Sequence, residues 1–146
     1  MIEQENILRG EGSTGVDCEM KERVMEAFEN LYYSQIGFQQ ELVNKGKYIG
    51  FTDRALLSLP KDDPKLFSYH MQAMLSELGE VLAADKRWKN YRNETTPEML
   101  EHKKEELADC FIVLMNMCIF SGLSSGEVLG AVASKINENY IRIMSK

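Results

Sequence analysis

The sequence predicts an all-α protein built as a four-helix bundle, and three observations support this fold class. Apolar residues recur at helical spacing through most of the 146 residues. Strand signals are weak, because no segment alternates cleanly between polar and apolar residues and β-branched residues are sparse. Start and stop signals for helices lie where the periodic segments begin and end.

The first half of the chain contains a tail, one long helix and a long connection. Residues 1–16 are expected to be a flexible tail, since three glycines lie close together there. Residues 17–146 are then expected to form a single domain, which is long enough to bury a core. Its first helix runs from about residue 18 to residue 43 and is weakened locally by Gly37. The connection at 46–64 holds two glycines and two prolines, and its unusual length indicates that it is functional or packs over the bundle.

Three further helices follow this connection. The second helix is expected from about residue 64 to residue 88. Thr96, followed by a proline, predicts the start of a third helix over 97–120 that stops at the next glycine. Ser124 and Glu127 have the spacing of a capping box, which predicts a fourth helix that ends near the C-terminus.

Composition and charge exclude several classes of function. A net charge of −6 argues against a nucleic acid polymer as partner. No run of eighteen apolar residues occurs, so no membrane span is expected. The N-terminus has no apolar signal core, and Cys110 and Cys118 lie about 12 Å apart along one predicted helix, too far for a disulfide. We therefore expect a cytoplasmic protein with free thiols.

Two pairs of carboxylates lie in the two most apolar helical segments. Glu77 and Glu80 are three residues apart, and so are Glu106 and Asp109. Residues at this spacing share one helix face, so each pair presents two oxygen ligands in one direction. The third helix is apolar on nearly every face and is expected to be buried. Burying four ionised carboxylates is costly unless a cation compensates, so the pattern favours a divalent metal site over ordinary surface charges.

The ligand types narrow the choice of metal. Carboxylates without a nearby cysteine or histidine ligand favour Mg²⁺, with Mn²⁺ or Ca²⁺ as substitutes. A di-iron bundle needs Glu-x-x-His on two helices, but Phe67 and Met99 stand three residues before the two histidines, His70 and His102. A zinc site is equally unsupported. Both histidines are therefore expected to be partly exposed residues without a catalytic role.

One face of the predicted fourth helix is basic. Lys135, Asn139 and Arg142 are spaced four and three residues apart. Two cations and an amide on one face can hold phosphate oxygens. Basic residues near a helix C-terminus are also favoured by the helix dipole, so this face alone does not indicate a phosphate site. Together with a carboxylate-held Mg²⁺, it predicts a polyphosphate site.

Three motifs carry a family resemblance. They are ELGE at 77–80, EELAD at 105–109 and KINENYIR at 135–142. This order resembles the all-α nucleoside triphosphate pyrophosphatase superfamily, which includes MazG, dimeric dUTPases, dCTP pyrophosphatases and phosphoribosyl-ATP pyrophosphohydrolase. The resemblance covers roughly residues 35–145 and implies a MazG-like or dimeric dUTPase-type fold.

Two further segments resemble the dimeric dUTPase branch. FQQELVN at 38–44 is similar to a first-helix segment in which a Gln and a later Asn contact the base, and DKRWKNYR at 85–92 is similar to a segment rich in lysine and aromatic residues. The implied base or sugar contacts are Gln40, Asn44, Trp88 and Tyr91, with Tyr140 as a further aromatic candidate. Solvated polar residues and packed aromatic residues are the alternative interpretation. Ser76 stands where MazG proteins often carry another Glu, which leaves the preferred base open.

The resemblance implies Mg²⁺-dependent hydrolysis of a nucleoside triphosphate, with dUTP as the best candidate, to the monophosphate and pyrophosphate. In this interpretation the four carboxylates hold two or more Mg²⁺ ions, and Glu80 is the expected general base. Lys135 and Arg142 would hold the outer phosphates, and Asn139 would orient a phosphate or the sugar.

Two alternatives remain open at the sequence level. One keeps the chemistry but changes the substrate to dCTP or a purine nucleotide. The other is a non-catalytic helical regulatory or binding protein. In either case a homodimer or homotetramer is expected, because the apolar third helix leaves surface to be covered.

Overall fold

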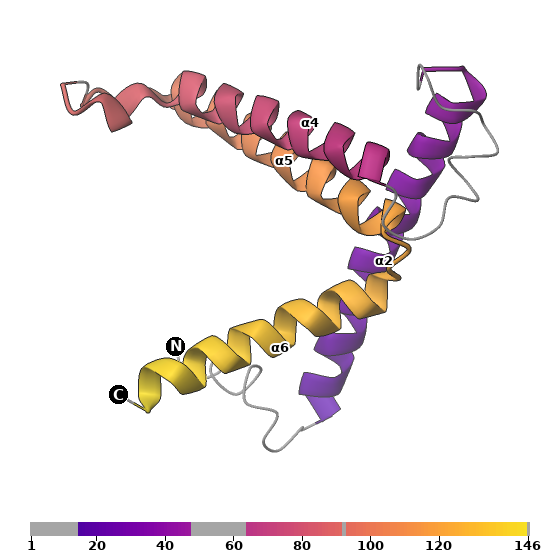
Figure 1. Ribbon diagram of the computed structural model, residues 1–146. Coiled ribbons are helices and arrows are strands. Elements are labelled where there is room, and N and C mark those ends of the chain that lie inside the picture. Colours follow the sequence, from indigo (N-terminus) through magenta and orange to yellow (C-terminus); the bar gives the residue numbers. More distant parts are fainter. Residues whose placement is uncertain (1–14, 48–63, 92, 146) are drawn as a thin grey trace. The chain divides into compact units, whose positions relative to one another are not determined.

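The computed structural model describes residues 15–47, 64–91 and 93–145 (Figure 1). Within these ranges every regular element is helical and no strand is present, which confirms the predicted all-α class. The elements are α2 (Gly15–Asn44), α4 (Pro64–Ala84), the 3₁₀ helix η1 (Lys86–Lys89), α5 (Pro97–Phe120) and α6 (Ser125–Met144).

Two predicted segments fall largely outside these ranges. Of the expected tail, residues 1–14 are not described, whereas Gly15 and Val16 already belong to α2. Most of the 46–64 connection also lies outside the described residues.

Contacts divide the chain into two compact units. One unit combines the described parts of Met1–Ser34 and Leu123–Lys146, and the other is Gln35–Gly122. In the first unit, the buried Tyr32 donates a hydrogen bond of 2.7 Å from its hydroxyl to the carbonyl oxygen of Leu123. This bond ties α2 to the residues just before α6.

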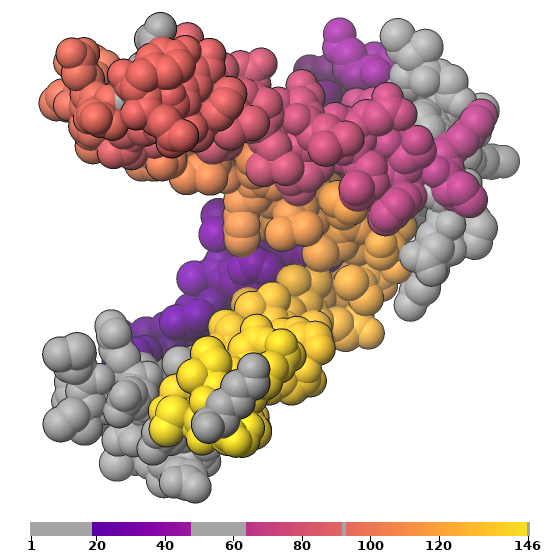
Figure 2. Space-filling model, turned by 60° about the vertical axis from the view of Figure 1, so that its left-hand side comes forward, coloured from indigo at the N-terminus to yellow at the C-terminus, as the bar shows by residue number. Residues whose placement is uncertain are grey.

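The second unit is organised around an antiparallel hairpin of α4 and α5 (Figure 1). The two helices lie against each other in the space-filling view as well (Figure 2). A small apolar core gathers at the end of this hairpin, where Val43 and Leu66 are buried and Leu42 and Phe120 pack against them. This packing joins the end of α2 to the start of α4 and the end of α5.

His70 is buried in this unit, which corrects the expectation of a partly exposed residue. Its side chain is 2% exposed, and its Nδ1 lies 2.9 Å from the carbonyl oxygen of Leu66. The ring stacks on Phe120 with centroids 5.0 Å apart and meets Tyr69 edge to face. Because burial disfavours the charged imidazolium, the pKa of His70 is lowered.

The predicted starts of α5 and α6 are confirmed. The Thr96 hydroxyl accepts a hydrogen bond from the backbone N–H of Met99 at 3.1 Å. Ser124 and Glu127 form both bonds of the capping box, with the Glu127 carboxylate accepting from the Ser124 backbone N–H at 2.7 Å. Local sequence therefore specifies where these helices begin.

The predicted end of the second helix near Trp88 is wrong. Helix α4 ends at Ala84, and Asp85 then caps the separate 3₁₀ helix η1 by accepting a hydrogen bond from the backbone N–H of Arg87. Asn90 follows with a positive φ of 50°. The chain therefore changes direction four residues earlier than its apolar pattern indicates.

The expectation that the third helix is buried on nearly every face is also wrong for the single chain. Helix α5 buries Val113, Met115 and Asn116 but exposes Phe111 and several leucines. In a hairpin of two helices, each helix covers only the face turned towards it. Large exposed apolar side chains remain on both helices: Leu75, Leu78, Leu82, Leu107, Phe111 and Leu114.

No single helix among the described residues has the length and hydropathy needed to cross a membrane. Helices α5 and α6 pass that test only when they are counted together across the break between them.

Candidate metal centre

Three carboxylates meet across the α4–α5 hairpin. One oxygen atom from each of Glu77, Glu106 and Asp109 can be chosen so that all three lie within 4.8 Å of one another. Glu77 comes from α4, whereas Glu106 and Asp109 lie one turn apart on α5. Glu77 and Glu106 are partly exposed and Asp109 is exposed. The hairpin therefore gathers three negative oxygen donors at a point that water can reach.

Glu80 is the one predicted ligand outside this group of three. Its side chain is exposed and lies one turn beyond Glu77 on α4. It is nevertheless close enough to act on its neighbours electrostatically. Desolvation raises the pKa of Glu77, and repulsion from Asp109, Glu106 and Glu80 raises it further.

The physical basis of the site thus differs from the sequence expectation. Burial of four carboxylates was expected to demand a cation, but Glu80 and Asp109 are exposed in the structure. The unfavourable energy at this site therefore combines partial desolvation with mutual repulsion among the carboxylates. A bound cation would relieve that repulsion as well.

Two neighbours of the acidic group have no role in the sequence-based site. His102 lies one turn before Glu106, and its Nε2 is 2.7 Å from a carboxylate oxygen of that residue. The four-residue spacing of the pair could have indicated this contact. Cys110 follows Asp109, and its thiol pKa is raised by desolvation and then by the charges of Glu77 and Asp109. The thiol is therefore held in its protonated form.

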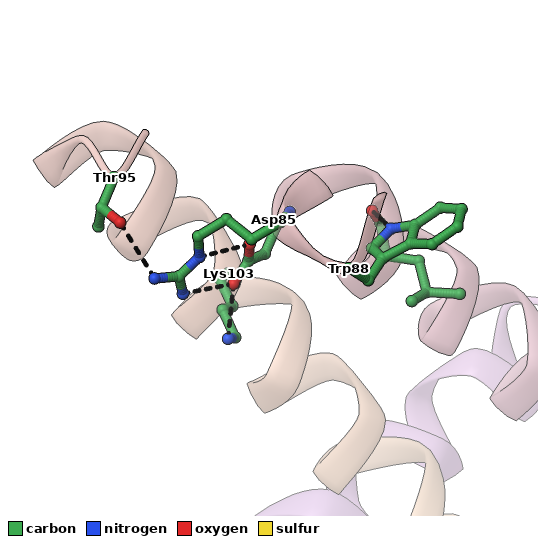
Figure 3. Close-up of polar contacts among 6 residues, drawn as sticks. Asp85, Trp88, Thr95 and Lys103 are labelled. Carbon is green, nitrogen blue, oxygen red and sulfur yellow. Dashed lines mark hydrogen bonds and ion pairs between the residues drawn. The ribbon is translucent and has the colours of Figure 1, made fainter. Parts of the chain in front are cut away.

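A second polar cluster lies at the turn between α4 and α5 (Figure 3). Asp85 Oδ2 accepts hydrogen bonds from Lys103 Nζ at 2.8 Å and from Arg87 Nη2 at 2.7 Å. Asp85 Oδ1 accepts from Arg87 Nε at 2.9 Å, and Arg87 Nη1 donates to the Thr95 hydroxyl at 3.0 Å. These bonds link the end of α4, η1, the following connection and α5.

The residues proposed to contact the base are dispersed within their unit. Gln40 donates a hydrogen bond of 3.0 Å to Asn44 on the same face of α2. Trp88 donates from Nε1 to the carbonyl oxygen of Leu82 at 3.1 Å, and Lys89 Nζ lies 5.2 Å from its ring centroid. Trp88 therefore packs back against the end of α4 (Figure 3).

Tyr91 lines an open cavity of about 750 Å³ beside the start of α5. None of the four candidate metal ligands lines this cavity. Its walls carry both charged and apolar groups, namely Ala83, Ala84, Lys86, Arg87, Tyr91, Asn93, Glu94, Thr96 and Met99. The cavity is therefore separate from the acidic centre.

The basic residues lie on α6, in the other compact unit. Lys135, Asn139 and Arg142 are all exposed, and Lys135 Nζ is 2.6 Å from a carboxylate oxygen of Glu138. Tyr140 is on the same helix. That the basic face and the acidic centre hold one substrate stays a prediction.

Comparison of the chain with models of protein families, with curated proteins and with solved structures gives no match. The family resemblance therefore rests on the motifs themselves.

Proposed function

We propose that the protein is a Mg²⁺-dependent nucleoside triphosphate pyrophosphohydrolase that releases pyrophosphate and a nucleoside monophosphate, with dUTP as its preferred substrate. The observation that carries this proposal is the convergence of Glu77, Glu106 and Asp109 from two helices. The motif order supports it, because ELGE, EELAD and KINENYIR follow one another as in the all-α pyrophosphatases. We place the activity in the cytoplasm, where free thiols such as those of Cys110 and Cys118 persist.

The donor set fits a hard divalent cation. All three converging groups are carboxylates, and the exposure of Asp109 leaves the centre open to water and substrate. Mg²⁺ is bound in this way in phosphate-processing sites, by a few carboxylates together with waters and substrate phosphates. When bound, such an ion lowers the pKa of coordinated water and offsets charge on the phosphoryl oxygens. Mn²⁺ is the expected substitute.

Glu80 takes a different role from the other three carboxylates in this proposal. It lies beside the converging group but outside it, so its carboxylate need not serve as a ligand. A carboxylate in that place can accept the proton of the attacking water. Glu77, Glu106 and Asp109 would hold the cation, and Lys135, Asn139 and Arg142 remain the predicted contacts to the phosphates and the sugar.

A panel of deoxynucleoside triphosphates, assayed for pyrophosphate release with Mg²⁺, tests the proposal. Glu106→Gln should lower the rate by about 100-fold or more, as expected for losing one group that offsets transition-state charge. Glu105→Gln is the matched control, since this exposed neighbour lies outside the converging group, and its rate should stay near wild type.

Failure to release pyrophosphate from any of these nucleotides would contradict the proposal. So would full activity in Glu106→Gln. Divalent cation binding without nucleotide turnover would favour the regulatory or binding protein instead. Activity on dCTP or a purine nucleotide but not on dUTP would keep the chemistry and change the substrate.

A further inference from the structure

The Asp85 carboxylate joins the end of α4 to η1 and α5 through several hydrogen bonds. It accepts hydrogen bonds from the Arg87 backbone, from two nitrogens of the Arg87 guanidinium and from Lys103 Nζ. The Asp85 side chain is only 10% exposed, whereas the α5 pair Lys104–Glu101 is more than half exposed on both sides. The ion pairs of Asp85 are therefore less exposed than an ordinary surface ion pair, which would contribute little to stability.

The connections of Asp85 restrict both helices. The bidentate fork of Arg87 fixes the plane of the carboxylate, and the bond from Arg87 to Thr95 anchors the guanidinium on the opposite side. The carboxylate then holds Lys103 from α5. The four hydrogen bonds that it accepts also keep the pKa of Asp85 well below its usual range.

This cluster and the acidic centre lie along the same helix pair. Lys103 precedes Glu106 by three residues and so shares its face of α5. Asp85 follows Glu77 by eight residues, about 12 Å along α4. Because the helices are antiparallel, the step from Asp85 to Glu77 and the step from Lys103 to Glu106 point the same way. The Asp85–Lys103 contact therefore restrains the register that brings the acidic side chains together.

A small slip would disrupt this arrangement. Movement of α5 by one residue shifts its side chains by about 1.5 Å along the axis and turns them by about 100°. Glu106 would then no longer lie on the face of α5 that meets Glu77. In the present register, one oxygen from each of the three converging carboxylates lies within 4.8 Å of the others.

We propose that Asp85, together with Arg87 and Lys103, is a positioning group for the acidic centre. It sets the register of α5 against α4 and thereby the affinity of Glu77, Glu106 and Asp109 for a divalent cation. This inference rests on the proposed function in one respect, since it requires that the acidic centre binds such a cation.

Direct titration of Mn²⁺ into the full-length protein, followed by electron paramagnetic resonance of the free ion, tests the inference. Lys103→Gln and Lys104→Gln each remove one positive charge from the same stretch of α5. If only charge mattered, both variants would bind Mn²⁺ as tightly as wild type or more tightly, because repulsion of the cation is reduced. A positioning role predicts instead that Lys103→Gln binds roughly tenfold more weakly, near the lower end for groups that orient metal ligands.

Two further variants complete the design. Lys103→Arg keeps a donor for Asp85 and should bind within about threefold of wild type, as expected if the contact rather than the lysine itself matters. Arg87→Lys keeps the charge but loses the fork, so it should weaken Mn²⁺ binding although charge alone predicts no change. Circular dichroism compares the helix content of all variants. If Lys103→Gln loses its helical signal, the Mn²⁺ affinity of Arg87→Lys tests the positioning role in its place.

The outcomes separate this inference from the proposed function. Wild-type protein that binds no Mn²⁺ contradicts the metal centre itself, and the positioning role falls with it. Wild-type protein that binds Mn²⁺, with Lys103→Gln and Arg87→Lys binding equally well, overturns the positioning role and leaves the metal centre intact.

Discussion

At the scale of single residues, the spacing of carboxylates was the informative signal. The spacing of three residues predicts that Glu106 and Asp109 share one helix face, and the structure brings both close to Glu77 on α4. The position of Glu80 outside the group could not be predicted, since it depends on the rotation of α4 against α5. The Asp85–Lys103 contact could not be predicted from local spacing either, because it joins residues that are eighteen apart in the sequence.

The pH dependence of stability provides a test for Asp85. Its hydrogen bonds lower its pKa in the folded protein, so the stability that they contribute is complete above the ordinary pKa of an aspartate and declines as the pH falls from there towards the lowered pKa. Asp85→Asn should therefore lower the urea midpoint clearly at pH 7 and progressively less towards pH 3. Glu101→Gln, from an exposed pair, is the control. An equal loss at both pH values would contradict this explanation.

The buried hydroxyl of Tyr32 provides a second test at this scale. Tyr32→Phe removes its bond to the carbonyl oxygen of Leu123 and should lower the free energy of unfolding by about 1 kcal/mol. The exposed Tyr33 is the matched control, and Tyr33→Phe should have little effect. Urea denaturation measures both variants, and equal stability of the two would show that the bond contributes nothing.

At the scale of helices, the starts of α5 and α6 and the end of α5 at Phe120 could be predicted, whereas the end of α4 could not. The starts of α5 and α6 depend on Thr96, Ser124 and Glu127, which act within one turn of sequence. The end of α4 depends on Asp85, whose partners include Lys103 from another helix. The burial of His70 likewise depends on Phe120, fifty residues away. Local patterns could not reveal either feature.

The capping box of α6 gives a prediction at this scale. Ser124→Ala removes the hydroxyl that accepts from the Glu127 backbone N–H and should destabilise the protein by about 1 kcal/mol. Ser125→Ala, one residue further into the helix, should change stability by less than about half of that. Thermal denaturation followed by circular dichroism measures the difference. A larger loss in Ser125→Ala would contradict the assigned cap.

At the scale of the whole molecule, the exposed apolar residues of the α4–α5 hairpin are the main feature. Leu75 is 65% exposed, and Leu78 and Leu82 continue its stripe on α4. Leu107, Phe111 and Leu114 are similarly exposed on α5. The predicted homodimer or homotetramer would cover such surfaces, which single chains seldom expose so extensively.

Self-association can be tested on this stripe. Wild-type protein should elute as a dimer or larger assembly in size-exclusion chromatography with light scattering. Leu75→Ser should weaken that assembly, because covering a leucine contributes about 1.5–3 kcal/mol. Gln72→Ser, an exposed change one turn earlier on α4, should leave it unaltered. A wild-type monomer at micromolar concentration would contradict the prediction.

The central claim is that the acidic centre of the hairpin supports attack by water on a nucleoside triphosphate so that pyrophosphate leaves. Phosphorus-31 nuclear magnetic resonance of dUTP incubated with the protein and Mg²⁺ tests this directly, because it identifies every phosphorus product. The account predicts dUMP and pyrophosphate in equal amounts, with conversion about 100-fold slower or more in Glu106→Gln. Formation of dUDP and inorganic phosphate, or conversion by Glu106→Gln at the wild-type rate, would contradict it.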